Sequence, residues 1–350
     1  MKLRHLTLLL LITSCSTTIR NFDDYQKQFL PKTTYMPSLE SIAGKAPKIV
    51  VFALDDNNNE IATQSSLSNS LANNVENILS KNRLGEIVDR KAATKLQKEI
   101  ALSEMNKTGS YKGPVIADYA VSGAISNAGF TSKYSNGSTY FNPQSKQMVL
   151  VPPKYTYTSD VAGNLKIYEL PSLAVVGSIE FNAKKSRSEA VQQDGGFALG
   201  GIQIGGKKVD GSKRDDSLVR KAGEEAISDI EVDIKNFFAK KGYILEKRIL
   251  ENKAIFKISL GSEDGLRQED KLEVSGQYEN ENALTNQVEI EHRIITNATV
   301  ADHIEPKVSW IVISDAKKID SIRLGDTVKL KYKKSRFAGV TKLAISMLEQ

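Results

Sequence analysis

A few residue groups have types and spacings that could support nucleotide binding or catalysis. Residues 201–208, Gly-Ile-Gln-Ile-Gly-Gly-Lys-Lys, come close to the glycine-rich loop that cradles nucleotide phosphates. Lys208, however, stands where that loop needs the Ser or Thr that binds magnesium. The next amphipathic pattern begins only near Asp215, too late for a helix N-terminus to meet a phosphate. The sequence therefore argues against a nucleotide site.

The acids and histidines indicate no catalytic centre either. Asp55 and Asp56 form a carboxylate pair, but a polar loop after a buried strand commonly carries such residues. A Ser-His-Asp site would need His292 or His303, and the chain has no G-x-S-x-G nucleophile motif. One cysteine and three histidines leave no material for thiol or zinc chemistry. We predict a protein that is not an enzyme, with no cofactor, no metal and no small-molecule substrate.

The single cysteine, Cys15, lies at the end of a secretory signal. A basic start (Met1 to His5) is followed by an apolar run (Leu6 to Ile12) and two small residues. Ile-Thr-Ser-Cys also resembles the bacterial lipobox, which implies that residues 1–14 are removed and that Cys15 is lipidated. The same resemblance implies that Ser16 sorts the protein to the outer membrane. The alternative is a soluble secreted protein with a chance cysteine near its cleavage site.

The length, hydropathy and charge of the chain indicate a globular protein of about two domains and argue against membrane helices and nucleic-acid binding. The chain has 350 residues, 40% of them hydrophobic, which suits about two globular domains. Apolar runs beyond residue 15 are strand-sized, so a helical membrane protein is excluded. The chain has 48 Lys and Arg residues and 42 acidic residues. Removal of the signal takes away Lys2 and Arg4, so the net charge of the mature chain is 46 − 42 = +4. Because these charges are scattered, we predict no nucleic-acid partner.

Residues 15–46 show no sustained periodicity and read as a lipidated N-terminus and tether. An α/β domain is predicted for residues 47–242. It begins with an apolar strand at 48–54 and continues through helices near 67–79 and 93–105, with a strand at 86–90 between them. A strand at 117–125, a hairpin at 164–182 and an amphipathic helix at 218–237 complete it. We expect Ile230 and Ile234 of that helix to cover the strands that contain Ile49 and Ala120.

Two polar insertions interrupt this domain, at residues 130–156 and 184–214. The first is rich in Ser, Asn, Tyr and Pro, and the second contains three glycine pairs. Both read as loops or hairpins that project from the sheet.

The pattern becomes all-β in residues 243–335, where five short strands are separated by polar turns. This spacing predicts a small barrel, followed by a tail at 336–350. The fold class is therefore α+β: a mixed sheet with packed helices, then a small SH3-like barrel.

Some strings also carry a family resemblance. Residues 117–125, Ala-Asp-Tyr-Ala-Val-Ser-Gly-Ala-Ile, resemble a strand of the curli secretion channel lipoproteins (CsgG-like). Asn-Leu-Lys-Ile-Tyr-Glu-Leu at 164–170 and Val-Val-Gly-Ser at 175–178 resemble the hairpin that follows it. The domain is also similar to the periplasmic domain of flagellar outer-ring proteins (FlgT-like) and of lipoproteins that activate peptidoglycan synthases. The barrel resembles the one that follows in the flagellar proteins.

The resemblance implies ring formation or partner binding without catalysis. We predict an outer-membrane lipoprotein that faces the periplasm and contributes to an envelope-spanning assembly, a flagellar ring or a secretion system. Its expected partners are the outer membrane, other envelope proteins and further copies of itself. The alternatives are an oligomeric secretion pore whose two insertions form membrane hairpins, and a peptidoglycan-synthase activator. Against the pore, Lys184 to Glu189 lack the alternation of a membrane strand.

Overall fold

The structure is a computed structural model that describes residues 17–42, 44, 46–106, 116–191, 198–199, 202–203, 214–281 and 288–334. These residues form two compact units. Unit 1 combines residues 17–44 with 239–332, and unit 2 comprises residues 46–238 with 333–334. Helices and sheets both contribute, so the α+β class is confirmed.

Unit 2 is built on a five-stranded mixed sheet with the order β3-β2-β4-β7-β8. β2 pairs in parallel with β3 and β4, whereas β4, β7 and β8 pair antiparallel. Ile49, Val50 and Val51 are fully buried, because helices cover both faces of β2. The strands are β2 (Lys48–Val51), β3 (Glu86–Val88), β4 (Tyr119–Ser135), β7 (Lys154–Glu169) and β8 (Ala174–Ala190).

Side-chain alternation along β2 assigns its two faces to different helices. Val50 and Phe52 share an apolar cluster with Leu96 and Ile100 of α4 (Thr94–Asn106). On the other face, α3 (Leu67–Lys81) packs against β2 and against α5 (Asp216–Asp229), and α5 lies along β7 and β8. The short helix α2 (Glu60–Gln64) is capped by Asn59, whose side chain accepts a hydrogen bond from the Ala62 amide.

The single helix predicted at 218–237 is wrong in one detail. It is divided at Ile230 into α5 and α6 (Glu231–Phe237), because the Ile230 amide bonds the Ile227 carbonyl three residues back and closes a tight turn. Most of the predicted apolar face nevertheless stays buried through the division, and only Phe237 is half-buried. The buried members are Leu218, Ala222, Ala226, Ile230 and Ile234.

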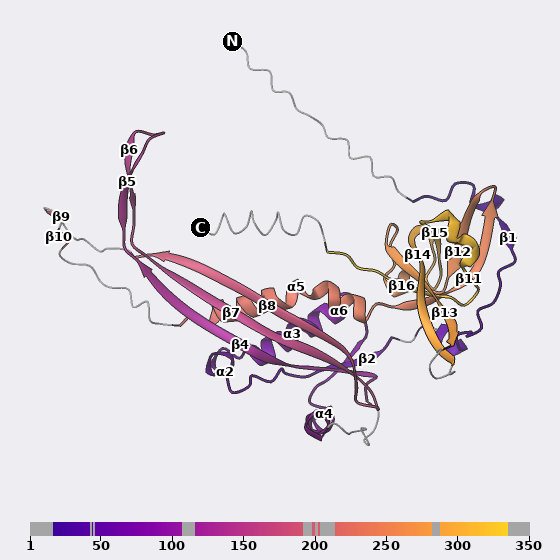
Figure 1. Ribbon diagram of the computed structural model, residues 1–350, viewed down its shortest axis with the longest axis horizontal. Coiled ribbons are helices and arrows are strands. Elements are labelled where there is room, and N and C mark those ends of the chain that lie inside the picture. Colours follow the sequence, from indigo (N-terminus) through magenta and orange to yellow (C-terminus); the bar gives the residue numbers. More distant parts are fainter. Residues whose placement is uncertain are drawn as a thin grey trace, which may run out of the picture. The chain divides into compact units, whose positions relative to one another are not determined.

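Three strands of unit 2 extend beyond its helices (Figure 1). β4, β7 and β8 contain 17, 16 and 17 residues, which corresponds to roughly 50 Å of extended chain. The segment predicted as an insertion at 130–156 is therefore largely strand, and it ends in a separate hairpin of β5 (Ser138–Asn142) and β6 (Gln147–Val151). In the segment at 184–214, β8 continues to Ala190 and a two-stranded hairpin follows, β9 (Ala198–Leu199) and β10 (Ile202–Gln203).

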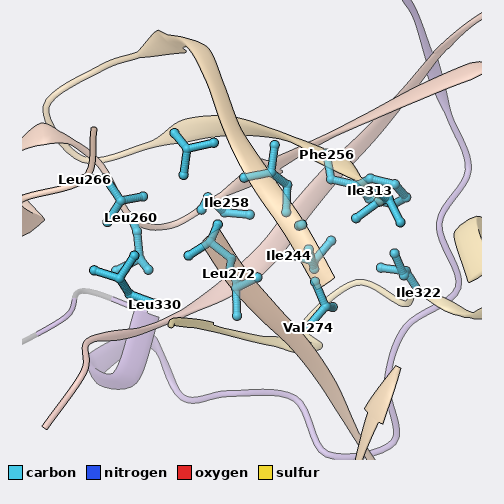
Figure 2. Close-up of a cluster of buried hydrophobic side chains, with 14 of the residues drawn as sticks. Ile244, Phe256, Ile258, Leu260, Leu266, Leu272, Val274, Ile313, Ile322 and Leu330 are labelled. Atoms are coloured by element: carbon cyan, nitrogen blue, oxygen red, sulfur yellow. The ribbon is translucent and has the colours of Figure 1, made fainter. Parts of the chain in front are cut away.

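Unit 1 contains a closed barrel of six strands. The order β11-β12-β15-β14-β13-β16 is closed by pairing of β16 with β11. Figure 2 shows the barrel core, in which Ile244, Phe256, Ile258, Leu272 and Val274 are buried together. The strands are β11 (Lys241–Leu250), β12 (Lys253–Ile258), β13 (Lys271–Glu281), β14 (Val288–Ile304), β15 (Ser309–Ile313) and β16 (Thr327–Leu330), with 3₁₀ turns η2 (Ser262–Asp264) and η3 (Ala316–Ser321).

The N-terminal segment differs from the predicted tether, because residues 17–33 are folded onto the barrel. β1 (Gln26–Gln28) pairs with β11, and Ile19, Tyr25 and Leu30 are buried. Apolar side chains of the barrel, Trp310 among them, supply the surface that these residues cover. The segment also contains η1 (Phe22–Asp24) and the short helix α1 (Leu39–Ile42).

Candidate functional site

The Asp55–Asp56 pair stabilises a turn. An oxygen of Asp55 accepts the Asn57 amide at 2.9 Å, and Asp56 accepts the Asn58 amide at 3.2 Å. The second oxygen of Asp56 accepts the Thr63 hydroxyl at 2.7 Å. Each carboxylate is thus engaged locally, which agrees with the solvated loop expected from the sequence.

The two histidines in the described part of unit 1 lie in different surroundings. His303 contacts Asp302 at 3.0 Å and stacks on Phe22, with ring centroids 4.2 Å apart. His292 lies 3.2 Å from the side-chain amide of Gln277. Among the described residues no serine hydroxyl is hydrogen-bonded to either ring, and no three His, Cys, Asp or Glu side chains are arranged to hold a metal ion.

Cys15 and Ser16 lie outside the described residues, as does the stretch 201–208 apart from Ile202 and Gln203. The lipidation and sorting assignments therefore remain predictions. No helix in the described part of the chain is long and apolar enough to cross a bilayer.

The outer half of the β4-β7-β8 sheet, which we call the distal sheet (residues 127–135, 154–162 and 182–190), carries aromatic rings on one face. Phe130 stacks with Tyr157 at 6.1 Å between ring centroids, and Tyr134 lies 5.0 Å from Tyr155. Tyr155 in turn stacks with Tyr157 at 6.1 Å. These rings form a continuous row across two neighbouring strands.

The opposite face of the distal sheet is polar. Hydroxyl pairs cross from β7 to β8, Thr158 with Ser186 at 3.0 Å and Thr156 with Ser188 at 3.2 Å. The Asn127 amide donates to Asp160, and apart from Gly129, Ala162 and Ala190 the residues of this face are polar or charged. One face of the distal sheet is thus hydroxyl-rich and the other aromatic.

Ion pairs tie the aromatic face to α5 and to the residue that caps its start. Lys185 pairs with Glu225 at 3.4 Å, and Arg187 pairs with Asp215 at 3.2 Å while lying over the Tyr157 ring. Burial acts to raise the pKa of Asp215, but hydrogen bonds from residues at the helix start and the Arg187 charge outweigh it and hold that pKa below its ordinary value. Since α5 begins at Asp216, the part of the sheet beyond Arg187 extends past the helix.

The β5–β6 hairpin lies at the end of this sheet (Figure 1). It exposes apolar side chains. Tyr140, Phe141, Met148 and Leu150 are 52%, 57%, 65% and 72% exposed. Phe141 lies opposite Met148, and neither strand contains a charged residue. Monomeric soluble proteins rarely expose such contiguous apolar surface, so this hairpin is a candidate contact site for a partner or a lipid phase.

Comparisons with known proteins give little guidance. No family model matches the chain, and no curated protein matches it. Similar solved structures include a point variant of the PelC dodecamer from Paraburkholderia phytofirmans, with 10% identity, 59% of this chain and 97% of that chain covered, and a TM-score of 0.25. Another is the PelC dodecamer from the same organism, with 12% identity, 57% and 94% covered, and a TM-score of 0.22. TM-scores of this size do not establish a shared fold.

Proposed function

We propose that this protein is a non-enzymatic lipoprotein of the outer membrane, anchored through Cys15 and facing the periplasm, that assembles with copies of itself into part of an envelope-spanning machine. The observation that carries the proposal is the uncharged, apolar β5–β6 hairpin at the end of a sheet with one aromatic and one polar face. Among the described residues of unit 2 these side chains remain exposed, which is typical of a surface that contacts a partner or a membrane.

The edges of the distal sheet support self-assembly. Among the described residues, the outer parts of β4 and β8 each pair only with β7. Unpaired edges offer free backbone donors and acceptors to another strand. Pairing of β8 in one copy with β4 in the next is a head-to-tail contact, and such contacts close into rings when the rotation permits.

The short N-terminal segment before Ile19 limits how far unit 1 can lie from a membrane that holds a lipid on Cys15. Ile19 is buried, and its amide donates to Asp302 at 3.0 Å. Cys15 precedes Ile19 by four residues, which can span at most about 14 Å. A lipid on Cys15 would therefore hold the barrel close to the bilayer surface.

A secretion pore is the second candidate, and the faces of the distal sheet favour it. A membrane barrel formed by several copies needs a polar face for its lumen and an apolar face for lipid. The hydroxyl rows and the aromatic row satisfy that alternation in part. Lys185, Arg187 and Glu189 on the aromatic face oppose it, and the five-residue strands of the β5–β6 hairpin are shorter than a bilayer crossing requires.

Removal of the hairpin tests the proposal. Ser135 and Lys154 are paired partners in register, so residues 136–153 can be replaced by Asn-Gly, a two-residue turn that closes such hairpins. The readouts are oligomer mass by light scattering, flotation with liposomes, and bilayer conductance, all on chains that carry Cys15→Ser so that no lipid holds them on the membrane. A matched control replaces exposed apolar residues elsewhere, Phe29→Ser with Leu39→Ser, which are 87% and 86% exposed.

We expect the shortened variant to lose oligomers or membrane association while the control keeps both. Conductance that appears only when the hairpin is present would favour the pore over the assembly component. The proposal would be refuted if the chain that keeps the hairpin and the shortened variant were both monomeric and neither bound liposomes.

A further inference from the structure

A recess of about 370 Å³ lies on the outer wall of the barrel, within unit 1. Its floor is formed by side chains of β11, β16, β13 and β14, and residues 33–37 of the N-terminal segment form one wall. This volume falls at the lower end of the range for small-molecule sites. The recess is thus large enough for a ligand of a few functional groups.

Two lysines face each other across the floor. Lys241 on β11 lies directly opposite Lys329 on β16, and like charges at this position destabilise a sheet. Burial lowers the pKa of Lys329, the Lys241 charge lowers it further, and Glu273 offsets these effects only in part. Among the described residues neither lysine forms an ion pair. The fold therefore maintains a repulsive pair of cations, which Glu273, directly opposite Lys329 on β13, offsets only in part.

The acids of the recess are already engaged by other cations. Glu273 pairs with Lys331 at 2.8 Å, and Asp326, which is 2% exposed, pairs with Arg323 at 3.1 Å. Neither Lys331 nor Arg323 lines the recess. The two lysines consequently give the recess a positive character despite the carboxylates beside them.

Hydroxyl donors lie next to the lysines. Tyr243, Thr327 and Ser275 form the adjacent row of the floor, with Tyr243 opposite Thr327 and Thr327 opposite Ser275. Within the described part of the chain, none of these hydroxyl groups has a hydrogen-bond partner. Ammonium and hydroxyl donors gathered in this way complement the oxygens of a carboxylate or a phosphate.

We propose that this recess binds an oxyanion, a carboxylate or phosphate group, with Lys241 and Lys329 supplying the charge and the hydroxyls of Tyr243, Thr327 and Ser275 supplying hydrogen bonds. The apolar wall formed by Met36 and Pro37 accommodates the organic part of the molecule that carries the group. The inference is independent of the proposed function, because it uses only unit 1.

An NMR titration of the mature chain, with Cys15→Ser so that it carries no lipid, tests the proposal. Inorganic phosphate and acetate are the two probes, and sodium chloride at matched ionic strength controls for screening. We expect saturable shifts of amide signals in β11 and β16 with at least one probe. The stronger probe identifies the group as phosphate or carboxylate.

Substitution of each lysine then assigns the site. Loss of one charge-assisted hydrogen bond weakens binding by about tenfold or more, so Lys329→Met and Lys241→Met should each do so. Lys253→Met, at an exposed lysine on β12, is the matched control and should bind as wild type does. Two independent variants keep the test valid if one of them misfolds. The absence of saturable shifts with both probes, or wild-type affinity in the folded lysine variants, would overturn the proposal.

Discussion

Gly123 on β4 and Asn164 on β7 approach so closely that a Cβ atom on Gly123 would lie within 3.0 Å of the Asn164 carbonyl oxygen. Asn164 also accepts the Ala124 amide through its side chain at 3.2 Å, beside a register shift between Ile125 and Asn127. Because the obstructing atom belongs to the backbone, the strands must separate to accept any side chain. Gly123 is thus required for β4 and β7 to pair at this close approach.

We predict that Gly123→Ala lowers the stability of unit 2. Overpacking of this kind costs about 1–3 kcal/mol, which corresponds to a fall of several degrees in melting temperature for a unit of this size. Ser122→Ala, at the half-buried neighbouring position, is the control and should melt close to wild type. Calorimetry on the chain without its lipid measures both, and equal melting temperatures would show that the strands can move apart at no cost.

Ile234 gives a second stability prediction. Its side chain is 1% exposed, and truncation of a buried isoleucine to alanine costs about 2–5 kcal/mol. Ile234→Ala should therefore lower the melting temperature of unit 2, whereas Lys221→Ala on the exposed side of α5 should not. A wild-type melting temperature for Ile234→Ala would contradict the burial. The helix does meet the strand of Ala120, since the ring of Phe237 in α6 lies 6.3 Å from that of Tyr119 on β4, whereas the side chain of Ala120 itself packs in the cluster of α4.

Asp326 gives a prediction about pH. Burial raises the pKa of this carboxyl above its ordinary value, although hydrogen bonds and the charge of Arg323 oppose the effect. The folded chain then holds the proton more tightly than the unfolded chain, so this group adds stability at low pH and loses it as pH rises through the raised pKa. Asp326→Asn cannot titrate. Wild type should therefore gain melting temperature relative to Asp326→Asn as pH falls from about 7 towards about 4; the opposite trend would contradict the assignment.

The sequence predicted those parts of the fold whose pattern is local. The apolar run from Ile49 gave a buried strand, and the spacing of Leu67, Leu71, Val75 and Leu79 gave the buried face of α3. Alternating residues separated by polar turns indicated the barrel. The lengths of β4 and β8 were missed, because Ser, Lys and Asn on the polar face conceal the alternation. The available sequence signal for the hairpin is the pair of aromatic residues, Tyr140 and Phe141, within a polar stretch.

Other features depend on pairing between distant residues and have no local signal. Lys241 and Lys329 are 88 positions apart (329 − 241), and only closure of the barrel brings them together. The sequence predicts a tether at residues 17–33 because Ile19, Tyr25 and Leu30 follow no helical or strand period. Their burial becomes visible only once the barrel surface exists. The sequence therefore predicts elements better than it predicts surfaces formed between them.

Phe22 gives a prediction about this N-terminal segment. Its ring lies 5.2 Å from that of Trp310, and the Arg248 guanidinium lies over both rings. Phe22→Ala removes the ring that the segment inserts into this group. We expect limited proteolysis to cleave residues 17–30 faster in this variant, while Phe29→Ala, at an exposed ring, leaves the rate unchanged. Equal cleavage in all three proteins would show that the contact does not hold the segment.

The anchor gives the last prediction. Cys15 is the only cysteine of the chain, so no other residue can accept a thioether-linked lipid. Cys15→Ser should abolish incorporation of a labelled fatty acid and leave an unprocessed or mislocalised protein. Ser16→Asp should keep the label but move the protein towards the inner membrane in a density gradient, because it changes only the residue assigned to sorting. Label retained by Cys15→Ser would refute the lipid anchor, and an unchanged gradient position for Ser16→Asp would refute the sorting role alone. The two variants thus separate attachment to a membrane from the choice of membrane, and only the first determines whether the barrel is held within reach of a bilayer.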